Sequence, residues 1–135
     1  MTRRVCLAGM VCLLGLLVGL GHAEDRRSLP FSKQSVFNYF RQVEDARRDI
    51  QENLKPEAFQ ERMCRLYADV LRHSGYDFEA TVQNAVQFAE KGSRKLDDAR
   101  FLFLAGVFQI HPDVFLKLGL ISKPTRDAVV SYLSS

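Results

Sequence analysis

The sequence predicts an all-α protein, a compact bundle of about five to six short helices that follows a cleaved N-terminal signal. Apolar residues recur at spacings of three and four along most of the chain, glycine or proline interrupts these stretches, and no pair of segments alternates apolar and polar residues as strands do. We expect a signal peptide over residues 1–23, a flexible lead over residues 24–31 and a single helical domain over residues 32–135.

The N-terminal segment has the composition of a secretory signal peptide. Arg3 and Arg4 precede an apolar run from Val5 to Leu20, and the small residues Gly21 and Ala23 stand just before a charged stretch. This order predicts cleavage after Ala23 and a periplasmic or secreted product. An uncleaved membrane anchor is the alternative, although the run is shorter than the ~20 residues that a bilayer crossing needs.

Three helices are predicted from apolar faces with clear boundaries. The first covers residues 35–54, and Pro56 begins the second, which runs to Ser74 because Gly75 suits the left-handed position that ends a helix. Asp77 caps a third helix, which we expect to end at Gly92.

The fourth segment is apolar on every side. We place its cap at Ser93 and its acidic first turn at Asp97 and Asp98, and the apolar residues after them are Phe101, Leu102, Phe103, Leu104, Ala105, Val107, Phe108 and Ile110. A helix of this composition must be covered all round, which predicts a central position in the bundle. A short helix then runs from Pro112 to Gly119, and a last helix opens at residues 122–124.

The charge of the mature chain excludes one class of partner. Loss of the signal peptide lowers the formal net charge from +3 to +1, because Arg3 and Arg4 are removed and no acid is. A domain so close to neutral lacks the cluster of lysines and arginines that a phosphate backbone requires. We therefore expect no nucleic-acid partner.

Reactive side chains are few. Cys64 is the single cysteine after the signal peptide, so it cannot form an internal disulfide. We interpret it as a small buried residue, the alternative being a reactive thiol or one paired with another chain. Only His73 and His111 remain as histidines, and no glycine cluster precedes a helix as a phosphate site requires. We predict no catalytic residue, no metal site and no cofactor.

These observations predict a protein that acts by contact with a protein partner in the cell envelope, as an accessory, chaperone-like or inhibitor subunit of an envelope or secretion assembly. A homodimer is compatible with this, and membrane contact is expected only through an uncleaved signal. The candidate partner surface combines apolar residues of the fourth and fifth helices: Phe101, Phe103, Phe108, Phe115, Leu116 and Leu118. The alternatives are a carrier that encloses a lipid or other apolar ligand among these side chains and, third, a small hydrolase that uses Cys64.

Overall fold

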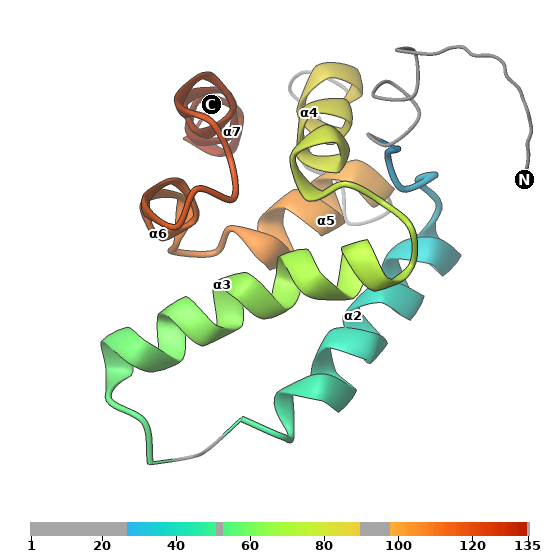
Figure 1. Ribbon diagram of the computed structural model, residues 1–135. Coiled ribbons are helices and arrows are strands. Elements are labelled where there is room, and N and C mark those ends of the chain that lie inside the picture. The colour runs from blue at the N-terminus through green and yellow to red at the C-terminus, as the bar shows by residue number, and fades with distance from the viewer. Residues whose placement is uncertain (1–26, 51–52, 90–97, 135) are drawn as a thin grey trace, which may run out of the picture.

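The computed structural model describes residues 27–50, 53–89 and 98–134, which form six α-helices and no strand (Figure 1). The helices are α2 (Lys33–Arg47), α3 (Pro56–His73), α4 (Phe78–Phe88), α5 (Ala99–Val107), α6 (Pro112–Lys117) and α7 (Lys123–Ser134). The prediction of an all-α bundle of short helices is confirmed for these residues. The predicted signal peptide, Gly92 and Ser93 lie outside them.

Short polar side chains define the helix starts. Ser32 and Ser35 form a capping box at α2, in which each hydroxyl accepts the backbone N–H of the other residue at 3.0 Å. The Asp77 carboxylate accepts the Ala80 N–H at 2.8 Å and caps α4, as predicted. Gly75 follows α3 with φ of +88°, the left-handed conformation expected there.

Three boundaries differ from the prediction. α4 ends at Phe88 and not near Gly92, because the backbone turns to an extended conformation at Ala89. α2 ends at Arg47, well before residue 54, because a run of charged residues gives the helix no apolar face to bury beyond Val43. Ile50 is still buried, outside the central hydrophobic cluster, in a turn in which its N–H donates to the Arg47 carbonyl at 3.0 Å. α5 begins at Ala99, because the Asp98 carboxylate caps it by accepting the Arg100 and Phe101 N–H groups.

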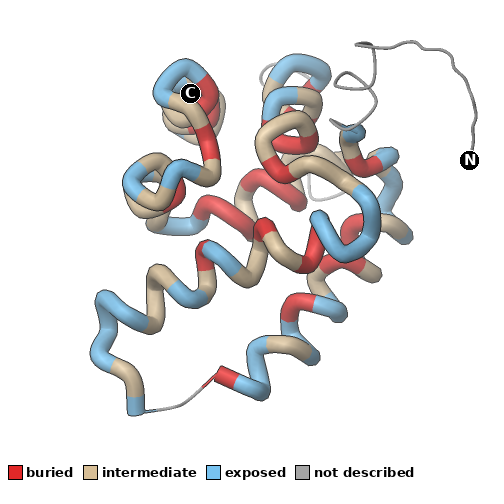
Figure 2. Tube along the Cα trace, in the orientation of Figure 1, coloured by how far each residue is buried: buried red, intermediate tan, exposed pale blue. Residues whose placement is uncertain are grey.

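The core is centred on α5, which contacts α2, α4 and α7. Phe103, Leu104 and Val107 of this helix are buried, and the other faces of α5 are partly exposed. The rings of Phe78, Phe108 and Phe115 form an aromatic cluster. Their centroids are 4.8 Å apart for Phe108 and Phe115, 5.3 Å for Phe78 and Phe115, and 6.2 Å for Phe78 and Phe108. Buried positions of neighbouring helices accordingly face one another across the interior (Figure 2).

Residues 27–31, the described part of the predicted flexible lead, are packed against the bundle. The Arg27 carbonyl accepts the Asp77 N–H at 2.7 Å, and the buried Leu29 donates its N–H to Thr81 Oγ1 at 3.1 Å. The Phe31 ring lies edge-on to Phe103, with centroids 5.4 Å apart. The prediction of a flexible lead is therefore wrong for residues 27–31. Leu29 and Phe31 bury apolar surface against the bundle, and this burial holds the segment in place.

Candidate functional site

Half of the predicted partner surface lies in the core. Phe103, Phe108 and Phe115 are at most 1% exposed, so a partner cannot reach them in this conformation. The Phe108 and Phe115 rings pack against Phe78 of α4, and the Phe103 ring packs against Phe31 and Tyr39. These three side chains belong to the central hydrophobic cluster.

Phe101, Leu116 and Leu118 are half-buried and keep accessible surface. The Phe101 ring packs edge-on against Tyr132 in the last turns of α7, with centroids 6.5 Å apart. Leu116 belongs to α6, where the adjacent Lys117 forms an ion pair with Glu61 of α3 at 3.1 Å. Leu118 packs against the core. A contact role for these three residues stays a prediction.

Cys64 has the properties of a core residue. Its side chain is fully buried within the central hydrophobic cluster. Burial, with a smaller contribution from the Glu61 carboxylate, raises the pKa of the Cys64 thiol to about 12. Since the thiolate is the nucleophilic form, a thiol that remains protonated at neutral pH favours the structural interpretation over the hydrolase alternative.

The histidines occupy the ends of helices. His73 is in the last turn of α3, where Nδ1 lies 2.8 Å from the Asp69 carbonyl oxygen, and His111 precedes Pro112 at the start of α6. Within residues 27–50, 53–89 and 98–134, no group of three or more potential ligands is arranged to hold a metal ion. None of the helices in this part of the chain combines the length and apolar character needed to cross a membrane.

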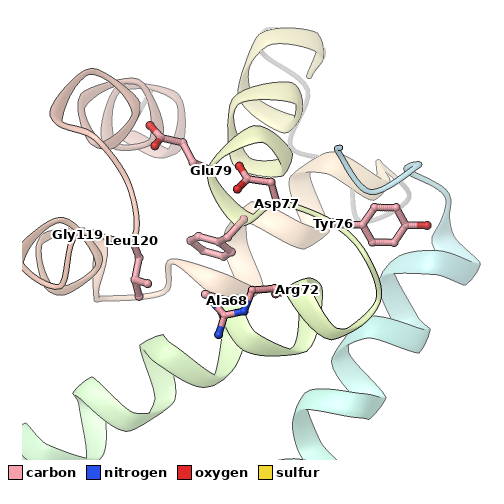
Figure 3. A pocket seen from close by; sticks show the side chains of 8 residues that line it. Ala68, Arg72, Tyr76, Asp77, Glu79, Gly119 and Leu120 are labelled. Atoms are coloured by element: carbon pink, nitrogen blue, oxygen red, sulfur yellow. The ribbon is translucent and has the colours of Figure 1, made fainter. Parts of the chain in front are cut away.

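A polar cluster joins α4 to the start of α7. Glu79 Oε2 accepts the Ser122 N–H at 3.0 Å, the Ser122 hydroxyl at 2.5 Å and the Thr125 hydroxyl at 2.8 Å. Gln83 Nε2 donates to Thr125 Oγ1 at 3.2 Å. Because a helix N-terminus has free N–H groups and a positive dipole end, a carboxylate there caps α7 from another helix. The Glu79 carboxylate points toward α7 accordingly (Figure 3).

One cleft of about 330 Å³ adjoins this polar cluster on the α3 side. It is lined by Ala68, Arg72, Tyr76, Asp77, Phe78, Glu79, Gly119 and Leu120 (Figure 3). Its charged groups already have structural roles: Asp77 caps α4, Glu79 binds α7 and Arg72 forms an ion pair with Asp69. A ligand would have to displace these interactions to use the same groups.

A second cleft, which we name the α4/α7 cleft, has a volume of about 370 Å³ and a mainly apolar lining. α4 and α7 contact each other on one side of the bundle (Figure 1) and form its two walls. Residues spaced by three or four positions line each wall: Gln83, Val86 and Gln87 from α4, and Pro124, Thr125 and Ala128 from α7. Sequence analysis missed this cleft because its apolar residues are small and alternate with polar ones. The sequence did contain one indication of the cleft: Val86 follows Gln83 by three positions and Ala128 follows Pro124 by four, so each pair lies on one face of its helix.

Comparison with protein-family models, with curated proteins and with solved structures gives no match for this chain. The function must therefore be argued from its own residues and surfaces.

Proposed function

We propose that this chain is an exported helical protein that acts by contact with a protein partner of the cell envelope, and that the α4/α7 cleft receives that partner. The observation that carries the proposal is the cleft itself, an open depression of about 370 Å³ with Val86, Pro124 and Ala128 as apolar lining. Ligand sites commonly have volumes of roughly 300–1000 Å³. Two parallel rows of residues at helical spacing suit the anchoring side chains of an amphipathic partner helix.

The floor of the cleft is held in place before a partner binds. Thr125 is 4% exposed, and its hydroxyl is bound to Glu79 and to Gln83 at 2.8 and 3.2 Å. These hydrogen bonds fix one wall of the cleft against the other. A preformed site loses less conformational entropy when a partner binds, which supports α4 and α7 as a contact surface.

Export is supported by the N-terminal sequence. The small residues Gly21 and Ala23 follow the apolar run and precede the charged residues that begin at Glu24, as at a signal-peptide cleavage site. Arg3, Arg4 and the apolar run up to Leu20 would supply the targeting function alone.

N-terminal sequencing of the product from separated cell fractions tests the export part of the proposal. We expect a mature chain that begins at Glu24 in the periplasmic or extracellular fraction. Recovery of the chain from the cytosol with Met1 still present would contradict export. It would not affect the proposed contact surface, which the cross-linking experiment tests separately.

Site-specific cross-linking tests the cleft. A photoreactive residue at Gln87, in the cleft wall, should give one protein adduct in the cells that make this chain, and the same residue at the exposed Gln42 of α2 should not. Ala128→Lys should abolish the Gln87 adduct, because the longer charged side chain fills the cleft. An identical adduct from both positions, or a lipid adduct at Gln87, would contradict a protein partner in this cleft.

A further inference from the structure

The solvent side of α3 carries cations that have no partner among the described residues. Lys55, at the N-cap, and Arg62 and Arg65, within the helix, are all exposed. At 100° per residue, the three positions lie within about a quarter of a turn around the helix axis. We name these three residues the basic face of α3.

The sequence of α3 leaves Arg62 without a neutralising neighbour. On a helix, side chains three and four positions apart are adjacent, and an acid at one of these positions would form an ion pair. The residues at these positions are Ala58, Phe59, Arg65 and Leu66. Arg62 therefore adds to the charge of Arg65 and is not compensated within its own helix.

Arg65 has acids at both four-residue positions, but other cations bind them. Glu61 forms an ion pair with Lys117 of α6 at 3.1 Å, which links two helices. Asp69 forms an ion pair with Arg72, one turn further along α3. Glu61 is therefore paired with Lys117 and Asp69 with Arg72, and neither acid is paired with Arg65.

This lack of partners sets the basic face apart from the other described cations. Apart from Lys33, each of them has a hydrogen-bond, ion-pair or ring partner within residues 27–50, 53–89 and 98–134: Arg27, Arg41, Arg47, Arg48, Arg72, Arg100, Lys117, Lys123 and Arg126. Among the described cations without such a partner, three of the four therefore belong to the basic face of α3, and the fourth is Lys33 of α2.

We propose that the basic face of α3 binds an acidic segment of a protein partner, with Arg62 and Arg65 as the recognition residues. Guanidinium groups bind carboxylates through paired hydrogen bonds, so two exposed arginines one turn apart suit neighbouring Asp or Glu side chains. This proposal rests on the proposed function, namely action by protein contact, and adds the chemistry of the partner and a surface separate from the α4/α7 cleft.

A protein segment fits this face better than a membrane. A helix that lies on a membrane inserts large apolar side chains beside its cations. The exposed large apolar residues of the described chain are Phe37, Phe88 and Ile110, none of which is on α3. Beside Arg62, Ala58 is exposed and the larger Phe59 and Leu66 are half-buried. The basic face therefore offers charge and hydrogen-bond donors without a membrane anchor.

A labelled decaglutamate peptide is the direct probe, with binding to the mature chain followed by fluorescence anisotropy at low ionic strength. Arg62→Glu with Arg65→Glu should weaken binding by about tenfold or more, because it reverses the charge of the recognition residues. Lys33→Glu with Arg48→Glu changes the net charge equally on α2 and should alter binding by less than about threefold. Circular dichroism of both variants should match the wild type, since all four side chains are exposed.

Three outcomes would overturn the proposal. These are no binding of decaglutamate by the wild type, equal loss in the α3 and α2 variants, or binding to phosphatidylglycerol vesicles that exceeds peptide binding and depends on Arg62 and Arg65. The last outcome would assign the face to an anionic membrane. Because the peptide assay does not involve Gln87 or Ala128, its failure leaves the cross-linking test of the α4/α7 cleft unaffected.

Discussion

The aromatic cluster and the α4/α7 seam, by which we mean the polar contacts of Glu79 with Ser122 and Thr125, show two ways in which this chain joins its helices. In the aromatic cluster, Phe78, Phe108 and Phe115 are in ring contact and at most 6% exposed. At the seam, Glu79 and Thr125 join the helices through hydrogen bonds, and an open cleft remains beside them. Large aromatic side chains from three segments thus supply stability, and the smaller side chains where α4 meets α7 leave accessible surface.

Truncation in the aromatic cluster should have the largest effect on stability. Phe115→Ala removes a fully buried ring that contacts Phe78, Phe108 and Tyr67, and it should lower the free energy of unfolding by about 3–5 kcal/mol. Urea unfolding followed by circular dichroism measures this. Phe37→Ala, at a ring that is 58% exposed, is the matched control and should change stability by less than about 0.5 kcal/mol. Similar losses in both variants would show that burial in the aromatic cluster is not what makes Phe115 important for stability.

Loss of the Glu79 carboxylate should have the next largest effect. Glu79→Ala leaves the Ser122 N–H and the buried Thr125 hydroxyl without their acceptor, which should cost about 1–3 kcal/mol. Glu79→Gln keeps one carbonyl acceptor and should cost less than Glu79→Ala. Hydrogen exchange should localise the effect to the first turn of α7. Unchanged protection there would contradict the role of Glu79 as a cap.

The contact between α5 and α2 can be tested at Gly106. An alanine Cβ at this position would overlap Cζ of the Phe40 ring, closer than van der Waals contact allows. Gly106→Ala should therefore destabilise the protein by about 1–2 kcal/mol despite the better helix propensity of alanine. In a Phe40→Ala background, the same change should become stabilising by about 0.5–1 kcal/mol. Thermal unfolding of the four proteins measures this sign reversal, and its absence would exclude a steric cause.

Much of the fold could be predicted from local sequence. Pro56, Gly75 and Asp77 mark boundaries through their own backbone and side-chain chemistry, and the structure places them where that chemistry requires. The packing of residues 27–31 depends on distant partners. Leu29, for example, is held by Thr81, which lies 52 residues away in sequence.

The candidate contact surface was harder to predict because apolar character alone does not say which side chains are covered. Phe103 and Phe115 look like docking residues in a list of phenylalanines, but rings from other elements bury both. The α4/α7 cleft depends on how two helices 35 or more residues apart approach each other. The basic face of α3 depends on Lys117 reaching Glu61 from α6, a pairing that the spacing within α3 does not indicate.

The smallest predicted effect is an alkaline loss of stability that originates at Tyr39, beside the aromatic core. Burial, with a smaller contribution from Tyr67, raises the pKa of the Tyr39 phenol well above its usual 10.0, and its hydroxyl donates to the Tyr67 carbonyl at 2.8 Å. Above about pH 10 the unfolded chain loses this proton and the folded chain keeps it, so the unfolded state is favoured. The stabilisation is complete below pH 10 and is lost as the pH rises toward the folded pKa, by about 1 kcal/mol at pH 11.

Tyr39→Phe separates this titration from packing. The variant should be less stable than the wild type by about 1 kcal/mol at pH 7, because it lacks the hydrogen bond to Tyr67, and the difference should shrink between pH 9 and pH 11. Urea midpoints across this range measure the convergence. Cys64, whose pKa is raised to about 12, adds an alkaline loss of the same sign, so the variant retains a reduced slope. Parallel curves for the two proteins would show that the phenol titrates equally in the folded and unfolded chains, as an exposed group would.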